Sequence, residues 1–590
     1  MLEANHSAGT PRGGAGSARA SGHAPTVWLD EDGAWRTTLR GPAVLADPRI
    51  NKGTAFSPAE REGLDLVGVL PHQVLTLEDQ VRRVYRQFRS QPTSLAKHLL
   101  LGDVQDRNQV LFYRLLADHL AELLPIVYTP TIGEAIQAYS HEYRRPRGVY
   151  LSAERPAAIE RSLRTTGMRA EDVDLIVATD AEAILGIGDW GIGGMGISRG
   201  KLAVYTTAGG IDPNRTIAVM LDVGTNNQAL RDDPLYLGLR RPRLSPNEYD
   251  QFVDAYVEAA SRLFPRALLH WEDFGTANAR RLLDRYRHRL PTFNDDVQGT
   301  GAINLGAVLA AVETTGTPLR AHRIVIFGAG TAGVGVADQL RDELVLEGLS
   351  PDEARARIWC LDRHGLVFDG LPDMTDAQRR YARTTAEIAG WKRHRVTGAV
   401  DLLEVVRHVR PSILIGASTV TGAFTHEIVR EMAAHAVRPI ILPLSNPTHL
   451  AEAQPADLLH WTEGRALIAT GSPFPSVDYN GISYEIGQAN NALIFPGLGL
   501  GAIAAGATRI TDGMIRAAAR AIAQLVEPST RGAPLLPPID RLRVTSQAVA
   551  VAVAQTARLE GVATALLGGD VTEHVRRLMW KATYRPVLPA

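Results

Sequence analysis

Two spacings of apolar residues alternate along the chain, and together they predict a mixed α/β protein. From Leu77 to Leu124, and again over 246–264 and 278–288, apolar residues recur three or four positions apart, as in amphipathic helices. Short apolar runs stand between helical segments at 173–178, 216–222, 267–271, 323–327, 357–362, 412–416 and 440–444. Because such runs alternate with helices, we expect buried strands in parallel sheets.

Composition narrows the classes of function. The 590 residues are 45% hydrophobic and 22% charged, with a formal net charge of -1. This balance gives no electrostatic footprint for nucleic acid or an anionic membrane, and we expect neither partner. The single cysteine, Cys360, excludes an intramolecular disulfide and a cysteine-rich metal site. The most apolar run, 492–505, is shorter than the ~20 residues of a membrane span, and no signal-peptide core stands near the start. We therefore expect a cytoplasmic protein.

A glycine-rich stretch follows the apolar run 173–178. It holds seven glycines between Gly186 and Gly200 and closes on Lys201. Glycine lets the backbone approach a ligand closely, so this density predicts a ligand cradle. Apolar residues follow Lys201, and desolvation there lowers the pKa of a lysine toward that of a usable base. A phosphate loop or a flexible turn with a solvated lysine fits the same pattern.

Two acidic pairs follow apolar runs. Glu272 and Asp273 end the run 267–271, and Asp295 and Asp296 stand in the next turn. Carboxylates gathered at strand ends repel one another unless a cation lies between them. All-oxygen ligands suit Mg²⁺ or Mn²⁺, so we predict a metal site. The alternative is that each acid caps the helix that follows it.

A dinucleotide-binding pattern, G-x-G-x-x-G, occurs three times, and only the occurrence that starts at Gly328 stands between a strand and a helix. That context predicts a pyrophosphate site at the start of the helix. Asp362 ends the next strand and favours a free ribose 2′-hydroxyl, hence NAD, whereas Arg363 beside it leaves NADP open. The predicted cofactor contacts are Gly328, Gly330, Thr331, Ala332, Gly333, Asp362 and Ser418.

Together these pieces resemble the malic enzyme family, from about residue 50 to the end of the chain. The resemblance rests on long motifs that recur in one order: 51–56, 128–133, 186–201, 222–225, 272–275, 293–299, the nucleotide loop, 444–448 and 490–491. Tyr128 lies in one of them, between Pro125 and Pro130, where the residues alone are equally typical of a buried core tyrosine.

The resemblance implies oxidative decarboxylation of L-malate to pyruvate and CO₂, with NAD and Mn²⁺ or Mg²⁺ as cofactors. It makes Lys201 the general base and Tyr128 the general acid. The implied metal ligands are Glu272, Asp273 and Asp296, with Asp295 beside them as an acid that supports the site. Asn446, Asn490 and Asn491 would bind the substrate. The family also implies a homodimer or homotetramer.

One position departs from the family pattern. Most of the family has an arginine that grips a malate carboxylate where this chain has Ala183. A small residue there is similar to the bacterial branch that includes malolactic enzymes, which convert L-malate to L-lactate and CO₂ with NAD retained. That reaction is the alternative to pyruvate release, and a catalytically silent nucleotide-binding regulator is a third hypothesis.

The pattern and the resemblance together predict the domain organisation. Residues 1–27 are rich in Gly, Ala and Ser, which predicts a disordered tail; a transit peptide is the alternative, although Glu3 and the lack of an amphipathic pattern disfavour it. We expect helices in an amino-terminal domain over 28–150 and in a carboxyl-terminal extension over 561–590. A substrate and metal domain covers 151–298 and is completed by 491–560, and a Rossmann-type NAD-binding domain covers 299–490.

Overall fold

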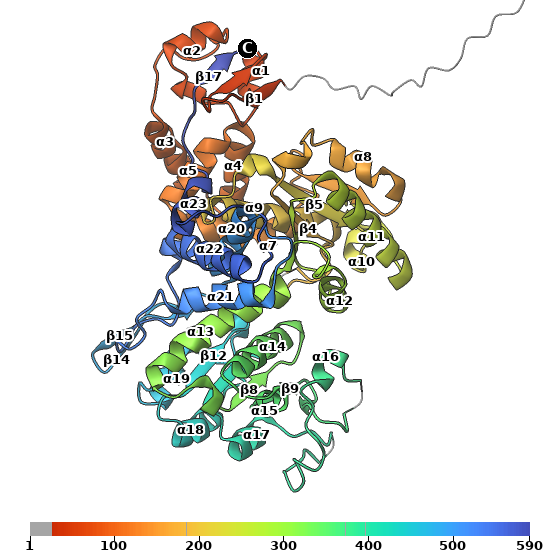
Figure 1. Cartoon of the computed structure of the whole chain (residues 1–590), viewed down its shortest axis with the longest axis vertical. Helices are drawn as coiled ribbons and strands as arrows, with labels where there is room; N and C mark the ends of the chain where they lie inside the picture. Colours follow the sequence, from red (N-terminus) through yellow and green to blue (C-terminus); the bar gives the residue numbers. More distant parts are fainter. Residues whose placement is uncertain (1–25, 185, 372, 396) are drawn as a thin grey trace, which may run out of the picture. The chain divides into compact units, whose positions relative to one another are not determined.

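The computed structural model describes residues 26–184, 186–371, 373–395 and 397–590 (Figure 1). The predicted tail therefore lies outside the described residues except for its last two positions. The chain divides into two compact units. One holds the residues up to Arg82 together with Gln105–Leu111 and Thr583–Ala590, and the other holds Arg83–Val104 and Phe112–Ala582.

The first unit contains a small sheet that joins the two ends of the described chain. Strand β2 (Trp35–Thr37) pairs antiparallel with β1 (Val27–Leu29) and parallel with β17 (Val587–Pro589). Two short helices, α1 (Pro42–Ala46) and α2 (Pro58–Gly63), accompany it. Only helices were expected at these ends of the chain, because three-residue strands are too short to show an alternating pattern.

A five-stranded parallel sheet forms the first half of the second unit. Its order is β3 (Val149–Ser152), β5 (Thr216–Asp222), β4 (Leu175–Thr179), β6 (Leu268–Trp271) and β7 (Thr292–Asn294). Apolar residues of α8 (Ile159–Arg164), α11 (Pro246–Leu263) and α12 (Thr276–Tyr286) share one core with these strands. Helix α9 (Met195–Thr207) packs on β4 and β5 and also contacts α20 (Phe495–Ala505).

A seven-stranded sheet forms the second half of this unit. Six strands run parallel and only the edge strand β10 is antiparallel, which is typical of a Rossmann-type fold. The order is β10 (Gly365–Leu366), β9 (Ile358–Asp362), β8 (Ile324–Phe327), β11 (Ile413–Gly416), β12 (Ile440–Pro443), β13 (Leu467–Thr470) and β16 (Gly487–Gln488). The predicted α/β fold with parallel sheets is confirmed.

The remaining helices include the stretch predicted from Leu77 to Leu124. The helical stretch from Leu77 forms α3 (Leu77–Arg89), α4 (Ser94–Arg107), α5 (Gln109–Asp118) and α6 (Leu120–Val127), and α7 (Thr131–Gln137) comes next. In the nucleotide-binding half lie α13 (Thr300–Thr315), α14 (Thr331–Leu346), α15 (Pro351–Ala356), α16 (Asp376–Arg379), α17 (Leu402–Val409), α18 (His426–His435) and α19 (Pro455–Trp461). The carboxyl-terminal helices are α20, α21 (Asp512–Ala523), α22 (Leu542–Leu559) and α23 (Val571–Leu578). Among the described residues, no helix is long and apolar enough to cross a membrane.

Candidate active site

Lys201 lies at the centre of a buried cluster of predicted site residues. It stands in the middle of α9 with 1% of its surface exposed. Its Nζ lies 2.9 Å from Oε1 of Glu272 and donates a hydrogen bond to Oδ2 of Asp295. The same Nζ lies 5.4 Å from the ring centre of Tyr128 and 4.4 Å from that of Phe495. The fold thus brings the predicted base, the predicted acid and two of the predicted acidic residues together.

The glycines before Lys201 allow α9 to pack closely against its neighbours. A Cβ on Gly194 would stand 2.3 Å from Cβ of Ala181, and one on Gly200 would stand 3.3 Å from the main-chain oxygen of Val127. Neither position tolerates a side chain without movement of its neighbour. These two glycines therefore serve helix packing, a role that the cradle interpretation of the sequence missed.

The charge of Lys201 differs from our expectation. Burial alone would lower the pKa of Lys201, but the neighbouring Asp295 and Glu272 carboxylates outweigh it and hold that pKa well above its usual value. The predicted downward shift in the pKa of Lys201 is therefore wrong. The sequence indicated the desolvation correctly, but it did not indicate that two acids would stand within ion-pair distance.

Tyr128 ends helix α6 and its side chain is 4% exposed. The predicted helical stretch ends at Leu124, but α6 runs through Pro125 to Val127. Burial raises the pKa of the Tyr128 phenol well above its ordinary value; Lys201 opposes this shift, and Glu272 and Asp295 add to it. The phenol therefore keeps its proton, which is the form that a general acid needs.

The acidic residues follow two neighbouring parallel strands. Glu272 and Asp273 come directly after β6, and Asp295 and Asp296 open a π-helical turn, Asp295–Gly299, after β7. One carboxylate oxygen from each of Glu272, Asp273 and Asp296 lies within 4.8 Å of the others. The main-chain N–H of Asp273, a residue with φ +55°, donates to Oδ2 of Asp296 at 2.9 Å.

The capping alternative does not fit these acids. The residue that precedes α12 is Gly275, and the side chain that caps the π-helical turn is Asn294, which accepts from the N–H of Val297. Burial raises the pKa of Glu272 to about 8 and that of Asp296 well above its ordinary value, with the neighbouring carboxylates adding to both shifts. A cluster of three carboxyls, two of them buried, is costly without a further cation besides Lys201, and its oxygen donors fit Mg²⁺ or Mn²⁺.

The predicted asparagines have different surroundings. Nδ2 of Asn491 donates to Oδ2 of Asp295 at 3.1 Å and to Oγ1 of Thr300 at 3.0 Å, which places it against the acidic cluster. Oδ1 of Asn490 instead accepts from the N–H of Ala492 and caps the next turn. Asn446 is exposed, and its Oδ1 accepts from Oγ of Ser472 at 2.6 Å.

The predicted nucleotide loop connects β8 to α14. Gly330 precedes the helix, Thr331 and Ala332 begin it, and a Cβ on Gly330 would meet only open space within 4 Å. A Cβ on Gly333 would stand 1.9 Å from the main-chain oxygen of Gly328, so the loop tolerates no side chain there. Oγ1 of Thr331 is buried and has no hydrogen-bond partner in the described part of the chain. An open helix start with an unsatisfied hydroxyl fits a phosphate ligand.

Asp362 ends β9 close to this loop. Nε2 of Gln378 donates both to Oδ2 of Asp362 and, at 3.0 Å, to the main-chain oxygen of Ala329. Gln378 therefore fixes the acid beside the glycine loop, where a ribose hydroxyl would lie. Ser418 follows β11, and its N–H and Oγ both donate to Oε1 of Glu452.

Comparison with known proteins agrees with this geometry. Residues 105–287 match the sequence model of the malic enzyme N-terminal domain, and residues 297–558 match that of the malic enzyme NAD binding domain. The chain belongs to the malic enzyme family. The two matched segments together span more than half of the chain, and the resemblance stated from its motifs is confirmed.

Individual malic enzymes are similar over nearly the whole length. The chain is 57% identical to NAD-dependent malic enzyme 3 of Bacillus subtilis, over 95% of this chain and 99% of that protein. It is 47% identical to NAD-dependent malic enzyme of Photorhabdus laumondii, over 92% and 96%. Among solved structures, malic enzyme from Pyrococcus horikoshii shares the fold with a TM-score of 0.53 at 24% identity, over 78% of this chain and 89% of that one.

Two site features of this malic enzyme family member were missed from sequence. Nε2 of His270 lies 2.8 Å from Oε2 of Glu272, and Oη of Tyr205 lies 2.8 Å from Nδ1 of the same ring. Burial lowers the pKa of His270 to about 3, so the ring is neutral, and one tautomer lets it accept from Tyr205 and donate to Glu272. His270 stands in the buried run 267–271, where a core residue is typical, and only the fold shows its contact with a predicted ligand.

The second missed residue is Arg243, which anchors the start of the glycine-rich stretch. Its guanidinium lies 3.1 Å from Oδ1 of Asp180 and 3.4 Å from Oδ1 of Asp189, and it donates to the main-chain oxygen of Asp180 at 2.8 Å. These acids raise the pKa of Arg243 against the effect of burial. No motif surrounds Arg243 in the sequence, so only the fold indicates its role.

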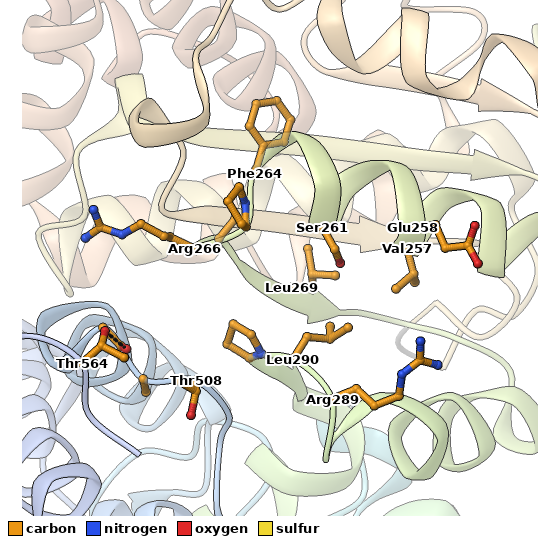
Figure 2. Close-up of a pocket in the computed structure, with 15 residues that line it drawn as sticks. Val257, Glu258, Ser261, Phe264, Arg266, Leu269, Arg289, Leu290, Thr508 and Thr564 are labelled. Carbon is orange, nitrogen blue, oxygen red and sulfur yellow. Dashed lines mark hydrogen bonds between the residues drawn. The ribbon is translucent and has the colours of Figure 1, made fainter. Parts of the chain in front are cut away.

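A separate cavity of about 480 Å³ lies at the amino-terminal ends of β6 and β7. Its lining includes Ala267 and Pro291, which precede β6 and β7, whereas the acidic cluster follows those strands. Leu269 and Leu290 form part of its wall, and Arg266 and Arg289 lie at opposite sides of it (Figure 2). Its charges do not converge on one point, unlike those of the cluster around Lys201.

Proposed function

We propose that this chain catalyses the oxidative decarboxylation of L-malate to pyruvate and CO₂ with NAD as the oxidant. The observation that carries the proposal is the contact of Lys201 with Glu272 and Asp295 beside Tyr128. A base, an acid and a group of oxygen ligands are then available within one buried site. The names of the relatives in Bacillus subtilis and Photorhabdus laumondii support NAD as the cofactor and malate as the substrate.

The proposed metal ligands are Glu272, Asp273 and Asp296, with Asp295 supporting them. When bound, a divalent cation supplies a Lewis acid for the C2 oxygen of malate and for the charge that develops as CO₂ leaves. His270 orients Glu272 through its Nε2–H, and Asp295 holds both Lys201 and Asn491. Positive charge added among these carboxyls acts against the upward shift in the pKa of Lys201.

Lys201 would take the proton of the C2 hydroxyl, and bound NAD would supply the acceptor for the C2 hydride. Tyr128, which burial keeps protonated, donates its proton to C3 after CO₂ has left. Asn491 and Asn446 bind a carboxylate of the substrate, while Asn490 keeps the turn that presents Asn491. With Ala183 in place of an arginine, the substrate carboxylate depends on these amides.

The nucleotide loop binds NAD in this proposal. The N–H groups at the start of α14 and Oγ1 of Thr331 would hold the pyrophosphate, and Asp362 would accept from the ribose hydroxyls. Ser418 contacts the cofactor from the end of β11.

The one cysteine, Cys360, is buried in β9, which fits work in a reducing cytoplasm. We also infer a homodimer or homotetramer, which light scattering of the purified protein tests.

A product assay tests the reaction. Purified protein receives L-malate, NAD and Mn²⁺, NADH is followed by absorbance, and pyruvate and lactate are separated by chromatography. We expect NADH and pyruvate in equal amounts. Lactate without free NADH would contradict the proposal and assign the malolactic reaction, in which the same residues serve an internal redox cycle. Binding of NAD without turnover would assign a regulator.

A further inference from the structure

Glu452 is a buried acid that lies between two loops of the nucleotide-binding half. Its side chain is fully buried, and its two oxygens accept four hydrogen bonds. Oε1 accepts from the N–H of Ser418 at 2.9 Å, from Oγ of Ser418 at 2.8 Å and from Oγ of Ser445 at 2.5 Å. Oε2 accepts from the N–H of Ser445 at 3.3 Å. One carboxyl group therefore joins the loop after β11 to the loop after β12.

The end of β11 is shaped to admit this side chain. A Cβ on Gly416 would stand 2.5 Å from Cδ and 2.8 Å from Oε2 of Glu452. Any residue larger than glycine would displace the carboxyl group from the loops. The two loops also touch directly, because the N–H of Thr419 donates to Oγ of Ser445 at 2.8 Å.

Each loop carries a residue of the proposed site. The first loop contains Ser418 and packs on the nucleotide loop, since a Cβ on Gly328 would stand 2.2 Å from the main-chain oxygen of Ala417. The second loop continues from Ser445 directly into Asn446, whose amide is one of the proposed substrate contacts. The position of the cofactor loop relative to the substrate loop thus depends on groups that meet at Glu452.

We propose that Glu452 is a positioning residue that holds the cofactor loop and the substrate loop in register. Through Ser418 it fixes the cofactor side, and through both polar groups of Ser445 it fixes the main chain that presents Asn446. Hydride transfer requires the two reactants to be aligned within a fraction of an ångström, so a fixed distance between these loops favours the reaction. This inference rests on the proposed function.

The variant Glu452→Gln disturbs the substrate loop more than the cofactor loop. The amide oxygen can replace Oε1 and keep three of the four hydrogen bonds, which leaves the amide NH₂ facing the N–H of Ser445. Two donors then oppose each other, and the loop that carries Asn446 must shift. We expect the KM for malate to rise about tenfold, while the Kd for NAD, measured by calorimetry, changes less than about twofold.

A double-mutant cycle shows whether the effect passes through Ser445. Ser445→Ala removes the Oγ that donates to Glu452, and it should raise the KM for malate in the same direction. The two changes weaken different hydrogen bonds of the same junction, since Glu452→Gln opposes the N–H of Ser445 and Ser445→Ala removes its Oγ. Once Glu452→Gln has shifted the loop, the Oγ bond has little left to hold, so we expect the double variant to be little worse than Glu452→Gln alone. Effects that add in full would overturn the proposal. Should Glu452→Gln not fold, Ser445→Ala alone carries the test, and an unchanged KM would reject it.

A matched control separates this role from a general loss of buried charge. Glu343 is also buried in the same half of the unit, but its partner is Arg520, away from both loops. Glu343→Gln should leave the KM for malate and the Kd for NAD unchanged. An equal rise of KM in the control would refute the positioning role. If wild-type protein does not oxidise malate, both proposals fail; if it does and Glu452→Gln keeps its KM, only the role of Glu452 fails.

Discussion

Lys201 tests the proposed chemistry most directly at the scale of the single residue. Lys201→Ala removes the base while leaving the nucleotide loop untouched, so we expect malate oxidation to fall by about 10²–10⁴-fold or more with NAD still bound. Turnover is followed by NADH absorbance and NAD binding by calorimetry. Lys392→Ala, at an exposed position, is the control and should be fully active. Near-normal turnover of Lys201→Ala would show that Lys201 is not the general base.

Asp222, at the end of β5, gives a prediction about pH and stability. Burial raises the pKa of Asp222 from 3.8 to about 6, although N–H groups of Leu239 and Gly224 donate to it. The folded protein therefore binds this proton more tightly than the unfolded chain does. The contribution of Asp222 to stability is fully present below the unfolded pKa and is lost as pH rises through about 6.

The variant Asp222→Asn removes this dependence on pH. Between pH 4 and pH 7 the wild-type protein should lose on the order of 2 kcal/mol relative to the variant. Thermal unfolding midpoints of both proteins, measured at several pH values in this range, report the difference. Parallel midpoint profiles for the two proteins would show that Asp222 keeps an ordinary pKa in the folded state.

The residue types of the site could be predicted from the sequence, but their electrostatics could not. Lys201, Tyr128 and the acids stand in motifs, whereas the distance of Lys201 from Asp295, 94 positions later in the chain, is set by packing of α9 on the sheet. For that reason the direction of the pKa shift of Lys201 was predicted wrongly. Arg243 and the contact of His270 with Glu272 likewise depend on residues brought together only by the fold.

At the scale of elements, the ends of β6 and β7 supply the predicted metal ligands from two separate turns. Asp296→Asn keeps the shape of its turn and removes one charge, so we expect the affinity for Mn²⁺ to fall about tenfold or more. Calorimetric titration with Mn²⁺ measures it. Asp284→Asn, on the helix α12 between the two turns, is the control and should bind normally. If Asp296→Asn binds Mn²⁺ as tightly as the wild type does, these acids have a structural role and are not metal ligands.

The contact between β9 and α16 predicts the choice of cofactor. Gln378 holds Asp362 beside the nucleotide loop, where its carboxylate would repel a 2′-phosphate. Asp362→Asn removes the repulsion and should narrow the preference for NAD over NADP about tenfold or more. Titration with each cofactor measures the ratio, and Asp373→Asn, an exposed acid of the same half, is the control. An unaltered ratio would show that Asp362 does not set the choice.

Elements with a clear period were predictable, and irregular ones were not. The run 216–222 is β5 residue for residue, and α11 lies within one residue of its predicted range, because long uniform patterns specify one structure. The π-helical turn after β7 and the passage of α6 through Pro125 have no such pattern. Both features determine where residues of the site lie. The fold was therefore predicted more completely than the geometry of the site. The domain bounds stay predictions.

At the scale of the whole molecule, metal binding is coupled to the free energy of unfolding, because the carboxyls of the acidic cluster destabilise the folded protein when no cation is bound. The carboxyls of buried Glu272 and half-buried Asp296 have raised pKa values because desolvation and their neighbours disfavour the charged forms. A divalent cation that binds the folded protein at a hundred times its Kd would stabilise it by about 2.7 kcal/mol. Adding Mn²⁺ to chelator-treated protein should therefore raise the thermal midpoint, and Asp296→Asn should lose most of that rise.

NAD should still raise the midpoint of Asp296→Asn, because the nucleotide loop lies on other strands. Equal Mn²⁺ responses of wild type and variant would place the stabilising cation elsewhere than among these three carboxyls.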